Sequence, residues 1–504
     1  MLNILLITAD QWRGDCLGLA GHPQVKTPHL DRLAADAVTF LRHYASTAPC
    51  SPARACLYTG LYQMNNRVCR NGSPLDARFD NIARAARRAG YNPTLFGYTD
   101  QSADPRGLDP RDPALKSYEG ILPGFTPRVR LIEDEKPWLS WLRGQGLDFA
   151  NRDEAHLPVA DKGSVTSSPT AYSKDETQTA FLTGEFIRWL GEQDAGKPWF
   201  AHLSFLRPHP PFVVPEPYNT MFSPDEVEGF RRAPAPSDEP QHPLLDFSLR
   251  NSRTADFVPG SNRLVADLTD AEFRQIKATY FGMIAEVDAQ LGRMFDAIRA
   301  ANNWDNTLIV FTSDHAEMLG DHWLLGKGGF FDESQHIPLV IRDPRNTAVH
   351  GKKVEAFTES VDVFPTLLDH FGTEPTHHPD GTSLSPFLAG ETPTAWRDDV
   401  HWEFDFRDVA NQTTERWFGL PSTRLNMAAI RDDRYKYVHF SALPPLLFDM
   451  LEDPDNLVNL ADDPKFLDVR LMLAEKLLAW RAEHLDQTLA LRELTANGVV
   501  RAKV

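Results

Sequence analysis

Short apolar runs alternate with amphipathic stretches along most of the chain. Apolar runs at residues 3–8, 93–98, 199–205, 307–313 and 337–341 predict buried strands. Apolar residues at helical spacing predict helices that begin near residues 27, 50, 81, 271 and 361. Strands that alternate with helices in this way indicate an α/β fold, in which a large, mostly parallel central sheet is flanked by helices.

Local residues mark where several of these helices begin and end. Thr27-Pro28 suits a helix start, because threonine caps free amide groups and proline fits the first turn. Gly60 suits the end of the helix that begins near Cys50. The long helix at 271–301 carries an apolar stripe at helical spacing, so we expect it to face the core.

The alternation is interrupted twice and then changes character. Residues 101–175 and 206–262 are rich in proline, glycine and charge, and we expect irregular loops there, the second of them on the substrate side. From about residue 395 the pattern changes to short β-like segments at 426–430 and 435–440, followed by a helix at 467–484. We therefore divide the chain into a main α/β domain, 1–394, and a smaller C-terminal α+β subdomain, 395–504, which ends in a helix and a tail.

Composition narrows the classes of function. The net charge of −18, from 52 basic and 70 acidic residues, argues against nucleic acid as a partner. No apolar run approaches the roughly 18 residues that a membrane helix needs. Four cysteines (Cys16, Cys50, Cys56, Cys69) are too few for a disulfide framework in 504 residues. The first residues form an expected strand rather than a signal peptide, so we expect a cytoplasmic protein with reduced thiols.

Two of the predicted strands end in candidate metal ligands. Asp10-Gln11 follows the first strand, and Asp314-His315 follows the strand at 307–313. Parallel α/β sheets bind ligands at the carboxyl ends of their strands. A single aspartate after a strand is more often a turn residue, so each pair alone is weak support and a third element is needed.

The third element is Cys50-Ser51-Pro52-Ala53-Arg54, followed by Leu57-Tyr58-Thr59-Gly60. Cys-x-Pro-x-Arg before Thr-Gly resembles the signature of the sulfatase family. Further segments resemble the same family in its order: the helix at 27–40, the lysine loop Gly326-Lys327-Gly328, the helix at 360–367 and the segment 447–460. The resemblance covers most of the chain, and it implies an alkaline-phosphatase-like fold with a catalytic domain at 1–394.

The resemblance also implies a chemistry. In the family, the cysteine is oxidised to formylglycine by a separate formylglycine-generating enzyme. Asp10, the Cys50-derived diol, Asp314 and His315 would then bind one divalent metal ion. A metal-bound hydroxyl of the hydrated aldehyde attacks sulfur or phosphorus, and the second hydroxyl later expels the product. Family members place two aspartates after the first strand, whereas this chain has only Asp10, so manganese, calcium and zinc all stay open.

The local chemistry of the other candidates agrees with these roles. Cys50 is expected at a helix N-terminus, where amide donors favour negative charge, with Arg54 one turn along to hold the converted residue or substrate oxygens. Lys327 lies in a glycine-rich loop that can approach a ligand closely. His209 stands between prolines that fix its backbone, which suits a general acid for the leaving oxygen.

Two departures from the family concern the substrate. Many sulfatases carry a lysine and a histidine where this chain has Tyr98 and Asp100, and Ala53 replaces a serine of the signature. Both features look like the subgroup of phosphonate monoester hydrolases and arylsulfatases. Fewer cations favour monoanionic esters: sulfate monoesters, phosphonate monoesters and phosphate diesters. Gln11, Asn71 and Tyr98 are the candidate substrate-binding residues.

Alternatives stay open at this point. One is a phosphodiesterase with only side activity on sulfates, and another is a non-catalytic anion-binding homologue. A cysteine phosphatase is disfavoured, because the spacing from Cys50 to Arg54 is too short for its phosphate loop. The subgroup resemblance, together with an apolar tail at 491–504, predicts a homotetramer or homodimer.

Overall fold

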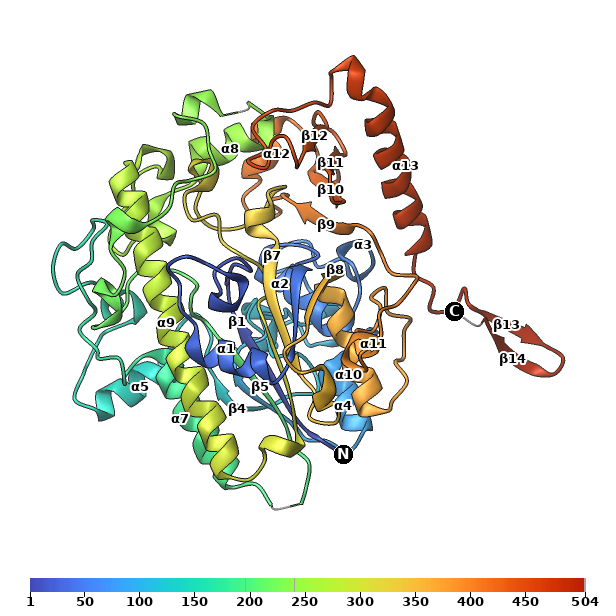
Figure 1. The fold of residues 1–504 in the computed structure, drawn as a ribbon, viewed down its shortest axis with the longest axis horizontal. Helices are drawn as coiled ribbons and strands as arrows, with labels where there is room; N and C mark the ends of the chain where they lie inside the picture. The colour runs from blue at the N-terminus through green and yellow to red at the C-terminus, as the bar shows by residue number, and fades with distance from the viewer. Residues whose placement is uncertain (195, 240, 503–504) are drawn as a thin grey trace.

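The computed structural model describes residues 1–194, 196–239 and 241–502. An eight-stranded sheet forms its centre, in the order β4-β3-β5-β1-β6-β7-β2-β8 (Figure 1). In that order the strands are Thr126–Arg130, Pro93–Gly97, Phe200–Phe205, Asn3–Ala9, Thr307–Thr312, His336–Arg342, Val38–Tyr44 and Lys353–Glu359. All neighbours pair in parallel except β7, which is antiparallel to both β6 and β2. The expected mostly parallel central sheet is confirmed.

Helices cover both faces of this sheet. One face carries α1 (Pro28–Ala35), α7 (Gln178–Gly191) and α9 (Asp270–Ala300). The other carries α2 (Cys50–Thr59), α4 (Ile82–Arg88), α10 (Val363–Phe371) and α11 (Ser385–Leu388). The remaining helices are α3 (Gln63–Asn66), α5 (Lys136–Gly144), α6 (Arg152–Ala155), α8 (Pro243–Asn251), α12 (Thr413–Phe418) and α13 (Leu467–Glu483). The predicted helix starts near 27, 50, 81, 271 and 361 are confirmed to within two residues.

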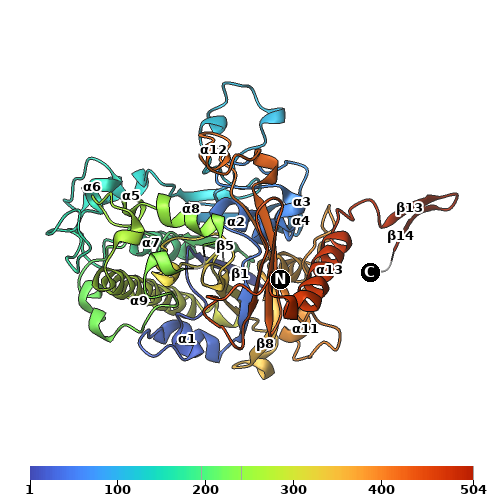
Figure 2. The same cartoon turned by 90° about the horizontal axis from the view of Figure 1, so that it is seen from above.

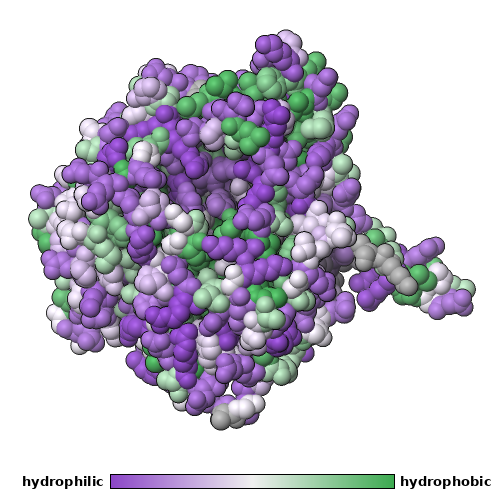
Figure 3. All heavy atoms as spheres, viewed as in Figure 1, coloured by the Kyte–Doolittle hydropathy of each residue, from purple (hydrophilic) through white to green (hydrophobic). Residues whose placement is uncertain are grey.

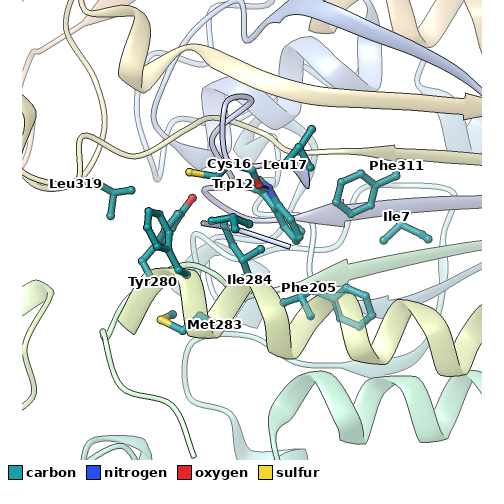
Figure 4. Close-up of a cluster of buried hydrophobic side chains, with 14 of the residues drawn as sticks. Ile7, Trp12, Cys16, Leu17, Phe205, Tyr280, Met283, Ile284, Phe311 and Leu319 are labelled. Carbon is teal, nitrogen blue, oxygen red and sulfur yellow. Dashed lines mark hydrogen bonds between the residues drawn. The ribbon is translucent and has the colours of Figure 1, made fainter. Parts of the chain in front are cut away.

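The central strand β1 shows why two cores form. All seven of its residues are buried. Because side chains alternate along a strand, Ile4 and Leu6 join the core under α2, α4 and α10, whereas Leu5, Ile7 and Ala9 join the core under α7 and α9. In the core under α7 and α9, Tyr280, Met283 and Ile284 of α9 lie beside Ile7, Phe205 and Phe311 of three adjacent strands (Figure 4).

Capping explains two helix boundaries. The long helix α9 begins at Asp270 behind a capping box, in which Thr269 and Glu272 satisfy each other's backbone amides. Gly60 ends α2 in the left-handed conformation with φ 67°, as its position predicts. Thr27 does precede α1, but its hydroxyl donates to Asp31 at 2.8 Å and accepts the Gly18 amide at 3.0 Å instead of capping an amide of this helix.

A second, antiparallel sheet lies in the last quarter of the chain. Its order is β12-β11-β10-β9, formed by Leu446–Asp449, Tyr435–Phe440, Asn426–Arg431 and Val400–Asp405. The helix α13 packs on it and completes a core with Cys56 and Tyr62 from the α2 region. The smaller C-terminal sheet is therefore confirmed, while the division at residue 395 stays a prediction.

The tail forms a two-stranded hairpin, β13 (Arg492–Thr495) and β14 (Gly498–Arg501). Both views show it projecting from the body of the molecule beyond α13 (Figures 1 and 2). Hydrophobic residues are visible on it in the space-filling view (Figure 3). Leu494, Val499 and Val500 are 84%, 59% and 52% exposed.

The structure corrects three expectations. Residues 101–175 are not wholly irregular, because β4 adds an edge strand to the sheet and α5 and α6 follow it. The Pro-rich stretch at 206–262 contains α8. The strands β2 and β8 were not predicted, since exposed or half-buried polar residues interrupt their apolar pattern.

Among the described residues, no helix combines the length and apolarity needed to cross a membrane.

Candidate active site

The carboxyl ends of β1 and β6 bring the predicted ligands together. The two strands pair in parallel, with Thr8 opposite Thr312, so Asp10 and Asp314 emerge side by side. The backbone amide of Gln11 donates to Asp314 Oδ1 at 3.2 Å, which joins the two loops directly. Gln11 itself is held in the left-handed region, with φ 68°. The sheet therefore sets the spacing of the carboxylates.

Cys50 meets these residues from another direction, as the first residue of α2. All ten residues of this helix are buried. The Cys50 Sγ lies 3.2 Å from His315 Nε2. On the other side of the ring, His315 Nδ1 lies 3.2 Å from the carbonyl oxygen of Ala316. Donation to that carbonyl places the proton on Nδ1 and leaves the Nε2 lone pair facing Cys50.

The cluster has the donor set of a metal site. Ligand atoms of Asp10, Cys50, Asp314 and His315 all lie within 4.8 Å of one another, and all four side chains are buried. The His315 Nε2 atom is 3.7 Å from a carboxylate oxygen of each aspartate. Asp10 Oδ1 is buried and has no hydrogen-bond partner in the structure. Since such an atom is costly to bury alone, the residues present fit one divalent cation.

Arg54 holds the two carboxylates in place. It is completely buried, with Nε 3.0 Å from Asp314 Oδ2 and Nη2 3.2 Å from Asp10 Oδ2. Its Nη1 donates to Ser204 Oγ at 2.8 Å and its Nη2 to Tyr98 Oη at 2.9 Å. The sequence predicts contacts with the converted residue or substrate instead. The reason for the difference is electrostatic, because two adjacent buried carboxylates need a counter-charge.

Lys327 reaches the site from the glycine-rich loop. Its Nζ donates to Gln11 Oε1 at 2.7 Å. Burial alone would lower the pKa of Lys327, but negative charge at Cys50 and Asp10 raises it above its ordinary value. Gly328 has φ 110°, and a Cβ there would lie 2.7 Å from the Phe404 ring. The loop therefore requires glycine to bring the lysine close.

Three further polar residues near this loop support it structurally. Glu317 accepts the amide of Gly326 at 2.6 Å and the side-chain amide of Gln11. Asp321 pairs with Arg13 at 2.8 Å, and His322 lies 3.3 Å from Glu239. These contacts occupy Glu317, Asp321 and His322 with other groups of the protein.

A pocket of about 1100 Å³ opens over the cluster. Its lining includes Cys50, Asn71, Tyr98, His209 and Lys327. Asn71 accepts the Ser51 amide at 3.0 Å through its oxygen, which leaves its NH₂ group to donate. The Tyr98 hydroxyl donates to Asp10 and accepts from Arg54, so it must exchange a partner before it can bind a substrate oxygen.

His209 stands in the same pocket with its proton placed by the backbone. Its Nδ1 lies 2.7 Å from the carbonyl oxygen of Pro210. Burial and the charge of Lys327 lower the pKa of His209 to about 3. The free protein therefore holds a neutral imidazole, and an anion bound beside it would raise this pKa.

A second cavity of about 700 Å³ shares Asn71, Asp256 and Lys327 with the first. Its wall is mixed: Leu244, Leu245, Phe247, Phe330, Phe404 and Phe406 form an apolar part, and Arg70, Asp405, Arg407 and Asp408 lie beside it. The space-filling view shows a hollow bordered mainly by hydrophilic residues on one face (Figure 3). Sequence reasoning missed this cavity, and it assigned no role to Tyr58 and Ser204 beside Arg54, because side-chain contacts between a helix and a strand depend on the tertiary fold.

Comparisons with known proteins agree on one family. The model described as Sulfatase matches residues 2–373, and that described as N-sulphoglucosamine sulphohydrolase, C-terminal, matches 320–483. The chain is 41% identical over 496 residues to the multifunctional alkaline phosphatase superfamily protein PehA of Trinickia caryophylli, covering 97% of this chain and 96% of that one. It is 27% identical to an arylsulfatase of Clostridium perfringens, covering 92% and 91%.

Solved structures give the same result. The phosphonate monoester hydrolase of Agrobacterium radiobacter is 60% identical with a TM-score of 0.98, and the alignment covers 100% of both chains. The phosphonate monoester hydrolase of Silicibacter pomeroyi is 40% identical with a TM-score of 0.94, covering 100% of this chain and 99% of that one. The expected alkaline-phosphatase-like fold is confirmed.

Proposed function

Because the chain belongs to the sulfatase family, we propose that it is a formylglycine- and metal-dependent hydrolase of monoanionic esters, of the arylsulfatase or phosphonate monoester hydrolase type. One observation carries the proposal: Asp10, Cys50, Asp314 and His315 converge in one buried cluster, of which Asp10 and Cys50 line an open pocket. The similarity to two phosphonate monoester hydrolases over the whole chain supports it.

Cys50 supplies the nucleophile after conversion to formylglycine by a separate maturation enzyme. The hydrated aldehyde carries two hydroxyls on one carbon. One oxygen attacks sulfur or phosphorus, and the bond to the leaving oxygen breaks. The second hydroxyl then loses its proton, the carbon–oxygen bond to the transferred group breaks, and the aldehyde is restored. A bound divalent metal would lower the pKa of a hydroxyl and polarise the ester.

Other side chains act on the charges that develop. Lys327 and the NH₂ group of Asn71 face the pocket and would donate to the non-bridging oxygens. Arg54 orients Asp10 and Asp314 through an ion pair with each. Because Arg54 is occupied with these carboxylates, Lys327 is the main cation left for the substrate, which favours one negative charge over two.

We expect the preference for monoanions to appear in matched 4-nitrophenyl esters. The sulfate, phenylphosphonate and phosphate diester should be hydrolysed with kcat/KM at least about 100-fold above that of the dianionic phosphate monoester. The measurement needs protein whose aldehyde content is known by mass spectrometry. A preference for the dianion would contradict the charge argument. Failure to hydrolyse any ester would favour the anion-binding alternative.

The two cavities give the phosphodiesterase alternative a specific basis. Phosphate diesters and phosphonate monoesters carry two organic groups, whereas a sulfate monoester carries one. Two cavities that meet at Asn71 and Lys327 would receive one group each. If the diester or phosphonate is turned over much faster than the sulfate in the same series, sulfate hydrolysis is the side activity.

His209 is proposed to protonate the leaving oxygen. Removing a general acid costs about 10²–10⁴-fold for poor leaving groups and much less for good ones. His209→Ala should therefore steepen the dependence of log kcat/KM on leaving-group pKa. Lys327→Ala should lower kcat/KM for all substrates, because Lys327 also faces the non-bridging oxygens. A His209→Ala line parallel to wild type would transfer the acid role to Lys327.

We also propose that the chain forms a homodimer or homotetramer through its projecting hairpin. Exposed Leu489, Leu494 and Val499 would find apolar partners on another copy. Truncation after residue 486 removes the hairpin without touching α13. Light scattering should show a smaller oligomer for the truncated protein, with the central fold retained by circular dichroism. A full-length monomer at assay concentration would refute the proposal.

A further inference from the structure

The pocket above Cys50 has a wall that does not suit an ordinary anionic substrate. Besides Asp10, seven carboxylates line its sides: Asp100, Glu119, Glu133, Asp134, Asp153, Glu154 and Asp256. On that wall the only lysine or arginine besides Lys327 is Arg152, within the part of the chain that the structure describes, and it already lies 3.4 Å from Glu133. An anion approaching Cys50 therefore passes a strongly negative surface.

Asp100 is the most unusual member of this wall. It is only 5% exposed and lines the pocket. Across the described residues, its carboxylate has neither a hydrogen bond nor an ion pair. Its backbone lies in the left-handed region with φ 50°. Such a side chain is costly to ionise without a partner, and a cationic group bound beside it would supply that partner.

The surroundings of Asp100 suit an ammonium group. Burial, together with the negative charges of Asp10 and Glu119, outweighs the positive charge of Arg54 and raises the pKa of Asp100 to about 8, so a cation bound beside it would favour the ionised form. Burial likewise raises the pKa of Glu119 to about 7. Tyr118 lines the same wall and donates its hydroxyl to Glu133 at 2.6 Å, which fixes its ring. Two carboxylates and an aromatic ring are the groups that bind organic ammonium ions in proteins.

We propose that the leaving group of the substrate carries a positive charge, an alkyl or quaternary ammonium, which Asp100, Glu119 and Tyr118 bind while the anionic centre lies at Cys50. The inference rests on the proposed function. His209, the proposed acid for the leaving oxygen, lines this same cavity and not the second cavity of about 700 Å³. The substrate is thus a zwitterion, whose positive end complements the acidic wall and whose negative end faces Lys327.

The test uses two phenylphosphonate esters of the same shape. One has 4-(trimethylammonio)phenol as its leaving group, and the other has 4-tert-butylphenol. Their intrinsic reactivities differ, so the quantity compared is the ratio of kcat/KM for the cationic over the neutral ester, in wild type and in variants. Asp100→Asn keeps the shape and the left-handed backbone, which asparagine also tolerates.

We expect Asp100→Asn to lower this ratio about tenfold or more, as for a largely desolvated ion pair. Glu119→Gln should lower it less, because Glu119 is half-buried. Asp134→Asn is the matched control, since Asp134 lines the same pocket but already pairs with Lys136 at 2.7 Å. Its ratio should stay within about twofold of wild type.

The possible results distinguish a failure of the cation site from a failure of the proposed hydrolase function. An unchanged ratio in Asp100→Asn, with the neutral ester still hydrolysed, overturns the cation site and leaves the proposed function intact. Loss of bound metal in Asp100→Asn assigns Asp100 to the metal site and also overturns it. Failure of aldehyde-bearing wild type to hydrolyse either ester counts against the proposed function itself.

Discussion

Cys50→Ala is expected to reduce turnover of every ester by at least about 10⁴-fold, because alanine leaves no group that can become a nucleophile. The loss should appear in kcat and not in KM alone. Intact-mass measurement of wild type should show the thiol-to-aldehyde difference, and Cys50→Ala should show none. Mass and activity then report on the same residue.

Cys56→Ala is the matched control for this variant. Cys56 is also completely buried on α2, but its thiol lies 3.3 Å from Asn66 and outside the ligand cluster. Its loss should cost some stability and leave kcat near wild type. Full activity in Cys50→Ala would remove the whole proposed mechanism, whatever the mass of the wild-type protein.

Asp314→Asn is expected to lose the divalent metal and about 10³-fold or more in kcat/KM. Asp314 contributes one of the two carboxylates in the cluster, and its Oδ2 also pairs with Arg54 at 3.0 Å. The amide keeps the size but removes the charge that both the metal and the guanidinium require. Metal content by mass spectrometry is the direct measurement.

Chelation followed by metal return extends the same test. Wild type should lose activity with chelator and regain it with Mn²⁺, Ca²⁺ or Zn²⁺, and the ion that restores most activity identifies the site's preference. Asp321→Asn is the control, because Asp321 is equally buried but pairs with Arg13 at 2.8 Å. Metal content unchanged in Asp314→Asn would remove this residue from the site.

The proximity of Asp10, Asp314 and His315 was predictable because these residues follow strand ends. Asp10 and Asp314 each close an apolar run, and the parallel pairing of β1 and β6 makes those runs neighbours. Cys50 could be added only through its motif, since nothing in the local pattern places the start of α2 opposite His315. The distance of 3.2 Å between Cys50 Sγ and His315 Nε2 depends on how α2 packs against the sheet.

The hydrogen-bond partners of Arg54 could not be predicted from the sequence. Its position one turn after Cys50 indicates proximity to the nucleophile, but not which atoms the guanidinium faces. Ser204 and Tyr98 come from β5 and the loop after β3, and only the strand order brings them together around Arg54. Side-chain direction depends on packing from several elements, which a linear pattern does not record.

Strand β4 illustrates the same limit in the fold. Its five residues, Thr126–Arg130, include a proline and only Val129 is buried. An edge strand needs few apolar residues, because one side and much of one face meet solvent. The pairing with β3 therefore stabilises a segment whose own pattern is that of a loop.

The complete burial of α2 limits when Cys50 can be modified. If Cys50 is converted as proposed, a modifying enzyme must bind the segment around it, and in the folded protein all ten residues of this helix are buried. We therefore expect oxidation to occur while the chain is still being made or is unfolded, in competition with folding. Chains that fold before oxidation would keep the thiol and stay inactive. The active fraction of a preparation would therefore depend on the rate of oxidation relative to the rate of folding.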